Sequence, residues 1–138
     1  MDRKSSPISP ILRSLVMVRV SQINWCSFCV DLNSSTLLKR GVTLDKVEAL
    51  QNWRASDLFN EQERVVLDYA EAVTRSDIQV DDELMARLKQ HFDDDFIVEL
   101  TGLIASQNLS SKFNSALAVP PHGFCQIPPA ASQTGKPD

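Results

Sequence analysis

The chain has 138 residues, 43% of them hydrophobic and 23% charged, which suits one globular domain with its own core. Its 14 basic and 18 acidic residues give a formal net charge of −4 and are spread along the chain, so we expect neither a nucleic-acid nor a membrane partner. Arg13 and Arg19 interrupt the early apolar stretch, which excludes a signal-peptide or membrane-span pattern, and an odd number of cysteines fits a reducing, cytoplasmic location.

The first part of the chain predicts two helices. Two early prolines suit an extended lead-in to a helix over residues 11–23, whose apolar positions form one helical stripe. The β-branched residues within 16–20 would also allow a strand, but no matching strand pattern occurs elsewhere. A second helix is predicted from near residue 26 to 39 or 40, ending at Gly41, because glycine suits the left-handed position after a helix end.

The middle of the chain predicts two more helices. Thr43 can cap a short helix that runs through Leu50. Asn60 and Glu63 resemble a capping box before a helix over 61–74, whose apolar stripe lies opposite a charged, solvated face.

The last two predicted helices include a long one. Asp81 can cap a helix through His91, and the acidic run 93–95 favours the start of a helix from 96 to about 119 rather than a metal site. A helix that is apolar on more than one side is usually covered by its own bundle and by a neighbouring subunit, so we expect a homo-oligomer.

Together these patterns predict an all-α, single-domain bundle of about six helices. We expect the folded domain to span residues 1–125. The Pro, Ala and Ser composition beyond it predicts a flexible C-terminal tail over 126–138.

A functional prediction depends on Cys26 and Cys29. Two cysteines separated by two residues lie on one face of a helical turn, close enough to be oxidised to each other. The unpaired N–H groups and positive dipole at a helix N-terminus favour thiolate, the reactive form of cysteine. The pair therefore predicts dithiol redox chemistry.

Two other interpretations of this pair fit less well. Half of a zinc site would need two further ligands, but His91, His122 and Cys125 are distant and unpaired in the sequence. An inert pair that fills the core stays an alternative, because cysteine is among the most buried residue types. We expect no metal and no cofactor.

The residues around the pair resemble a known family. The likeness rests on Arg19-Val20-Ser21-Gln22-Ile23-Asn24-Trp25-Cys26-Ser27-Phe28-Cys29-Val30-Asp31-Leu32-Asn33, followed by Gly41, with further matches at 57–63, 100–104, 113–114 and 120–121. This pattern resembles the carboxymuconolactone decarboxylase superfamily, specifically its alkylhydroperoxidase D-like branch. The resemblance covers most of the chain and implies an all-helical fold and a ring-like homo-oligomer, a hexamer or a trimer.

The resemblance also implies roles. In that branch the second cysteine attacks peroxide and the first closes the disulfide, which assigns attack to Cys29 and resolution to Cys26. The helix-terminus argument alone would favour Cys26 as the reactive thiol, and the prediction follows the family. The branch's relay glutamate and histidine are replaced by Ser14 and Asn33, so general-base assistance, typically worth roughly 10²–10⁴-fold in rate, is lost.

No substitute base is evident in the sequence. Asp31 lies two residues from Cys29 and so on another side of the helix, which suggests a solvated or bridging surface charge. His122 and Cys125 would approach the site only if the end of the chain folded back, and we expect His122 to be exposed to solvent.

The sequence thus predicts a thiol-dependent peroxidase or disulfide oxidoreductase, an alkylhydroperoxidase-like antioxidant that is weakened by its missing relay. Its partners would be a hydroperoxide and a dithiol or protein reductant. The alternative is a non-peroxidatic, redox-responsive or binding member of the superfamily. A carboxymuconolactone-type decarboxylase comes third, because that branch generally lacks the cysteine pair.

Overall fold

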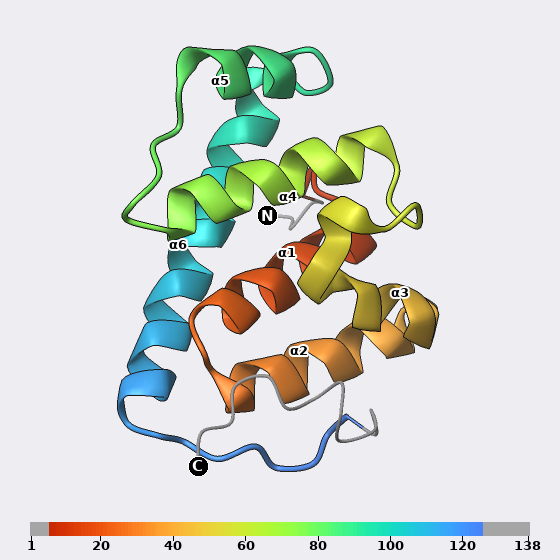
Figure 1. The fold of residues 1–138 in the computed structure, drawn as a ribbon, viewed down its shortest axis with the longest axis vertical. Helices are drawn as coiled ribbons and strands as arrows, with labels where there is room; N and C mark the ends of the chain where they lie inside the picture. The colour runs from red at the N-terminus through yellow and green to blue at the C-terminus, as the bar shows by residue number, and fades with distance from the viewer. Residues whose placement is uncertain (1–5, 126–138) are drawn as a thin grey trace.

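Residues 6–125 are described by a computed structural model, so the tail predicted over 126–138 lies outside the described residues. Within 6–125 the regular secondary structure is helical, without a strand. The elements are α1 (Pro10–Ile23), α2 (Ser27–Lys39), α3 (Leu44–Ala49), the 3₁₀ helix η1 (Leu50–Ala55), α4 (Glu61–Thr74), α5 (Asp82–Lys89) and α6 (Asp94–Ala116). The predicted all-α fold of six α-helices is confirmed (Figure 1). No helix among residues 6–125 is both long and apolar enough to cross a membrane.

Five of the helices in the described part of the chain begin after a side-chain cap, and all of these caps except Ser9 were predicted from the sequence. The side chains of Ser9, Thr43, Asn60, Asp81 and Asp93 each accept the backbone N–H three residues later, at the starts of α1, α3, α4, α5 and α6. The capping box of Asn60 and Glu63 is present. Other predicted boundaries were wrong: α5 ends at Lys89 and not at His91, α6 spans Asp94–Ala116 and not 96 to about 119, and η1 continues directly from α3. The ends of α3 and α5 lack a glycine or proline stop signal, whereas α6 ends four residues before Pro120 and Pro121.

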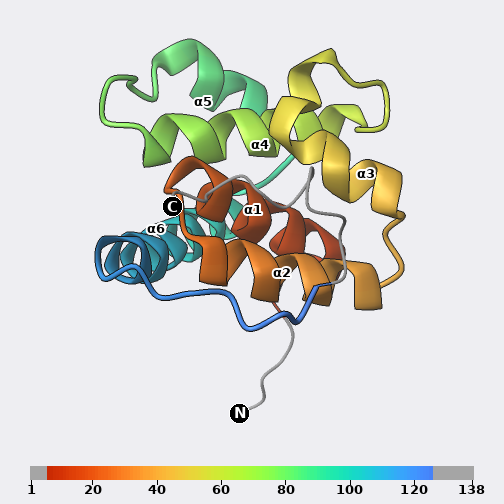
Figure 2. The ribbon, with the colours of Figure 1, turned by 60° about the horizontal axis from the view of Figure 1, so that its bottom comes forward.

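Helix α1 is the centre of the bundle. Figures 1 and 2 place it between α4 on one side and α2 on the other, with α6 alongside. Its Leu15 and Val18 pack with Leu37 and Trp53, whereas its Val16 and Val20 pack with residues of α4, α5 and α6. Because α1 is buried on nearly every side, the β-branched residues that would also have allowed a strand are packed in the core as part of a helix.

Helix α6 leaves part of its apolar surface uncovered. Val98, Leu109, Phe113 and Leu117 of α6 and its C-cap are 72%, 73%, 62% and 63% exposed. One small bundle therefore does not cover all the apolar sides of α6, as the sequence indicated.

The chain after α6 turns back toward α2. Ala118 takes a left-handed φ of 54°, and the N–H of Val119 bonds the carbonyl of Asn114, which ends α6 sharply. In Figure 2 the following segment crosses from the end of α6 and runs along α2.

Candidate functional site

The cysteine pair lies in the turn between α1 and α2. Helix α1 ends in a Schellman motif, in which Trp25 N–H bonds the carbonyl of Gln22 and Cys26 N–H bonds the carbonyl of Ser21, at 3.2 and 3.1 Å. Trp25 holds the left-handed position, with φ of 58°, where most residues cost about 1–2 kcal/mol more than glycine. Its side chain is nevertheless 69% exposed. This turn fixes the backbone of Cys26.

Cys26 is at once the end of that turn and the N-cap of α2. Its sulfur accepts the N–H of Cys29 at 3.1 Å, and the two Cα atoms are 5.2 Å apart, within the range for a disulfide. The two sulfurs form a disulfide, as the spacing predicted. Cys26 and Cys29 are only 0% and 3% exposed. A reductant or peroxide therefore needs a movement of the protein to reach them.

The polar side chains that the structure places around the pair are neutral. Asn114 of α6 directs Nδ2 at the Cys29 sulfur, 3.8 Å away. One turn beyond Cys29, Asn33 donates to the Ser21 hydroxyl at 3.2 Å, and Gln107 donates to the same oxygen at 3.2 Å. Amides and hydroxyls hold these groups in place but do not titrate near neutral pH.

A second group of amides anchors the end of α1 to α6. Asn24 donates to Asn108 Oδ1 and to Ser111 Oγ, both at 2.8 Å. Sequence reasoning missed Gln107, Ser111 and Asn114 as neighbours of the site. Their spacing of four and three residues places them on one face of the helix and could have indicated this polar face. The sequence pattern of this helix was interpreted from its apolar residues alone.

The two predicted relay positions lie apart. Asn33 contacts Ser21 of α1, next to the cysteine turn. Ser14 lies seven residues earlier on α1, roughly two turns or 10 Å away, and its hydroxyl accepts a 2.8 Å bond from Arg40 at the far end of α2. The structure therefore brings Asn33 to the pair and leaves Ser14 at the opposite end of the α1 and α2 contact.

Asp31 bridges α2 to the returning chain. Its carboxylate accepts the backbone N–H groups of His122, Phe124 and Cys125 at 3.2, 2.9 and 2.7 Å. The His122 side chain is exposed, as predicted, yet its ring meets the Phe28 ring edge-on at a centroid distance of 5.3 Å. No pattern in the sequence predicted that the chain folds back here, and it does.

The charged groups of highest burial lie on the opposite side of α1. Glu71 of α4 is 7% exposed and accepts bonds from Arg19, Trp53 and Arg54. Burial by itself raises the pKa of Glu71. The hydrogen bonds from Trp53 and Arg19 and the positive charge of Arg19 outweigh this effect and hold the pKa of Glu71 below its ordinary value. This network ties α1 to α4 and η1.

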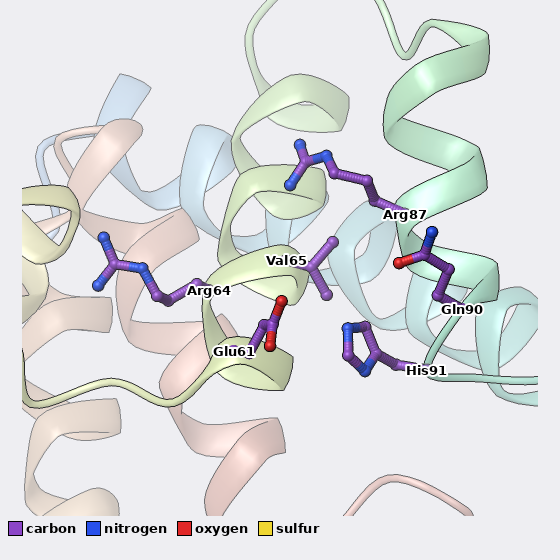
Figure 3. A pocket seen from close by; sticks show the side chains of 6 residues that line it. All are labelled: Glu61, Arg64, Val65, Arg87, Gln90 and His91. Carbon is purple, nitrogen blue, oxygen red and sulfur yellow. The ribbon is translucent and has the colours of Figure 1, made fainter.

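A cavity of about 440 Å³ between α4 and α5 is also remote from the cysteines (Figure 3). Two cations line it, but Arg64 points away and donates to the carbonyls of Arg54 and Ser56, while Arg87 is paired with Asp68 at 2.6 Å. Both arginines are therefore already bound by groups of the protein itself. Within residues 6–125 no group of three His, Cys, Asp or Glu side chains lies close enough to hold a metal ion.

Comparison with known proteins identifies relatives. The model of the carboxymuconolactone decarboxylase family matches residues 2–72. The uncharacterized protein YnjA of Escherichia coli K12 is 47% identical over 128 residues, 93% of this chain and 70% of its own. The uncharacterized protein YdfG of Bacillus subtilis 168 is 32% identical over 115 residues, 83% of this chain and 78% of its own.

Solved structures show the same fold. A protein of unknown function from Agrobacterium tumefaciens, described as a candidate AhpD antioxidant defence protein, matches with a TM-score of 0.80 at 28% identity, over 83% of this chain and 80% of that one. An uncharacterized peroxidase-related protein from Silicibacter sp. TM1040 also matches with a TM-score of 0.80, at 24% identity, over 90% of this chain and 66% of that one.

Proposed function

The chain belongs to the carboxymuconolactone decarboxylase family, in its AhpD-like branch, and we propose that it is a thiol-dependent peroxidase in which Cys26 and Cys29 cycle between dithiol and disulfide. The observation that carries the proposal is the disulfide in the turn that begins α2, where Cys26 caps the helix and accepts the N–H of Cys29. A helix N-terminus stabilises thiolate, so the reduced pair has a built-in means of activation.

The proposed reaction has three balanced steps. The thiolate of Cys29 attacks a hydroperoxide, so that an S–O bond forms, the O–O bond breaks, and the alcohol leaves with a proton from solvent. Cys26 then attacks the sulfenic acid, which forms the disulfide and releases water. An external dithiol supplies two electrons and two protons to restore both thiols and is itself oxidised to a disulfide.

The surroundings of the pair support slow turnover. Asn114 lies against the Cys29 sulfur, and Asn33 and Ser21 bond each other nearby, but none of them can accept a proton from a thiol near pH 7. General-base assistance is typically worth roughly 10²–10⁴-fold, so the rate should fall below that of a protein with a titrating relay. The same observation favours a second candidate, a redox-responsive protein that forms the disulfide without efficient peroxide turnover.

Peroxide consumption with dithiothreitol as reductant separates the two candidates. Cys29→Ser and Cys26→Ser remove one sulfur each, and Cys125→Ser is the matched control because Cys125 lies outside the disulfide. We expect catalytic consumption of cumene hydroperoxide by the parent and by Cys125→Ser, and none by the other two variants. Equal consumption by the parent and Cys29→Ser would reject the peroxidase and leave the redox-responsive protein.

We also propose that the chain assembles as a homo-oligomer through α6. Its exposed Val98, Leu109 and Phe113 form an apolar surface that a second copy would remove from water. Light scattering at micromolar concentration should give the mass of a trimer or hexamer. A mass of one chain would reject the assembly, and Leu109→Lys should weaken it if α6 is the interface.

A further inference from the structure

The disulfide is closed to solvent, and this raises the question of what moves when the pair is reduced. Both sulfurs belong to residues that are at most 3% exposed. Attack by an external thiolate requires it to approach one sulfur along the S–S bond, so a closed site must open first. The part of the structure that can open with least disruption is the segment that folds back over α2.

We call residues 117–125 the strap. It starts at the end of α6, next to Asn114, whose amide is 3.8 Å from the Cys29 sulfur. It reaches α2 at Phe28 and Asp31, the residue before Cys29 and the second residue after it. The strap therefore crosses from α6 to α2 (Figure 2), and it contacts α2 at residues on either side of Cys29 in the sequence.

The carboxylate of Asp31 attaches the strap to α2 through three backbone N–H groups. Asp31 Oδ1 accepts from Cys125, and Oδ2 accepts from His122 and Phe124. Gly123 makes this possible with a left-handed φ of 81°, which turns neighbouring N–H groups toward one point. Such a concave set of N–H groups is a recognised binding shape for an anion, and here the anion is a side chain of the protein itself.

The helices around the pair are held far more firmly. Val20 of α1, Leu37 of α2 and Ile104 of α6 are all 0% exposed in the two cores. By contrast, His122 and Phe124 of the strap are exposed, and the strap has no residue in either core cluster. Local opening occurs preferentially where few apolar contacts are buried, so the strap should open before α1, α2 or α6 moves.

We propose that the strap is a latch, fastened by Asp31, that controls the access of a reducing dithiol to the Cys26–Cys29 disulfide. Closed, it excludes the reductant. Open, it lets a thiolate attack one sulfur to form a mixed disulfide. The second thiol of the reductant then displaces the protein sulfur, so two electrons and two protons pass to the pair. The proposal rests on the proposed redox use of the pair but not on peroxide as its substrate.

The test measures reduction alone, without peroxide. The oxidised protein is mixed with dithiothreitol, quenched with a maleimide at set times and digested with trypsin, which releases residues 20–39 with both cysteines on one peptide. Three variants are compared with the parent: Asp31→Ala, a chain that ends at Val119, and Asp57→Ala. Asp57→Ala is the matched control, because Asp57 is an exposed aspartate away from the strap.

We expect Asp31→Ala and the shortened chain to be reduced at least tenfold faster than the parent, and Asp57→Ala to match the parent. Far-UV circular dichroism confirms that each variant is folded, and the two strap variants act by different changes, so one remains informative if the other unfolds. Reduction of a folded Asp31→Ala or a folded shortened chain at the parental rate would overturn the proposal. Because no peroxide is present, failure of the peroxidase assay leaves this result independent.

Discussion

Glu71 of α4 joins this helix to α1 and η1 through three hydrogen bonds. Its Oε2 accepts from Arg19 Nε at 2.8 Å and from Trp53 Nε1 at 2.7 Å, and its Oε1 accepts from Arg54 at 3.1 Å. Glu71→Gln keeps the shape of the side chain but removes its charge and one acceptor. Arg19 is then left partly buried without a counter-charge.

The expected cost follows from which partners are buried. Removing one member of a buried ion pair typically costs about 3–5 kcal/mol. The Arg54 side chain is 56% exposed, so its share is screened, and the glutamine oxygen can still accept from Trp53. We therefore expect Glu71→Gln to lower the free energy of unfolding by about 2–4 kcal/mol. At about 3.5 °C per kcal/mol for a chain of this size, the melting temperature should fall by roughly 7–14 °C.

Urea unfolding followed by circular dichroism measures this difference, with all proteins at one concentration because assembly would shift the apparent stability. Glu48→Gln, an exposed position on α3, is the matched control and should change stability by less than about 0.5 kcal/mol. Adding Arg19→Met to Glu71→Gln should recover part of the loss, since it removes the unpaired charge. A loss below about 1 kcal/mol, or no recovery in the double variant, would refute the reasoning.

Three further predictions concern pH and the cysteine site. Burial alone would raise the pKa values of Glu71 and Asp68, but their hydrogen-bonding and charged partners hold these pKa values below the ordinary 4.5 and 3.8. The stability that the two carboxylates contribute is therefore complete above these ordinary values, and it is lost as the pH falls through the folded pKa values. The unfolding free energy should therefore drop below about pH 4.5 in urea titrations, and an equally steep drop in Glu71→Gln would contradict a role for Glu71. Asn33→His should raise peroxide consumption at least about tenfold at pH 7, because a histidine there could act as a general base. Ser14→Glu should add nothing to this gain, because Ser14 lies beside Arg40. Strong coupling of the two changes in kcat would show that the positions cooperate after all. Asn114→Leu should slow iodoacetamide alkylation of Cys29 in the reduced protein by about tenfold. A hydrogen bond to a charged group is worth about 1.5–3 kcal/mol, and the length of this contact places it at the low end of that range. An unchanged rate would mean that the amide does not stabilise the thiolate.

The sequence by itself determined the helices and the disulfide, because both depend on local geometry. Apolar spacing and caps such as Asn60 and Asp81 act within one or two turns, and the two residues between Cys26 and Cys29 fix their separation whatever surrounds them. Gly41 marked the end of α2 for the same reason, since its φ of 95° suits few other residues.

Only the tertiary structure decided what surrounds the pair. Ser14 and Asn33 are equivalent as replaced relay positions in the sequence, but the antiparallel contact of α1 and α2 sets Ser21 beside Asn33 and Ser14 beside Arg40. Asn114 reaches Cys29 from 85 residues away along the chain, and Cys125 of the strap reaches Asp31, two residues after Cys29, from 94 residues away. Such contacts depend on how whole helices pack and on where the chain turns after α6, and no local pattern of residues specifies either.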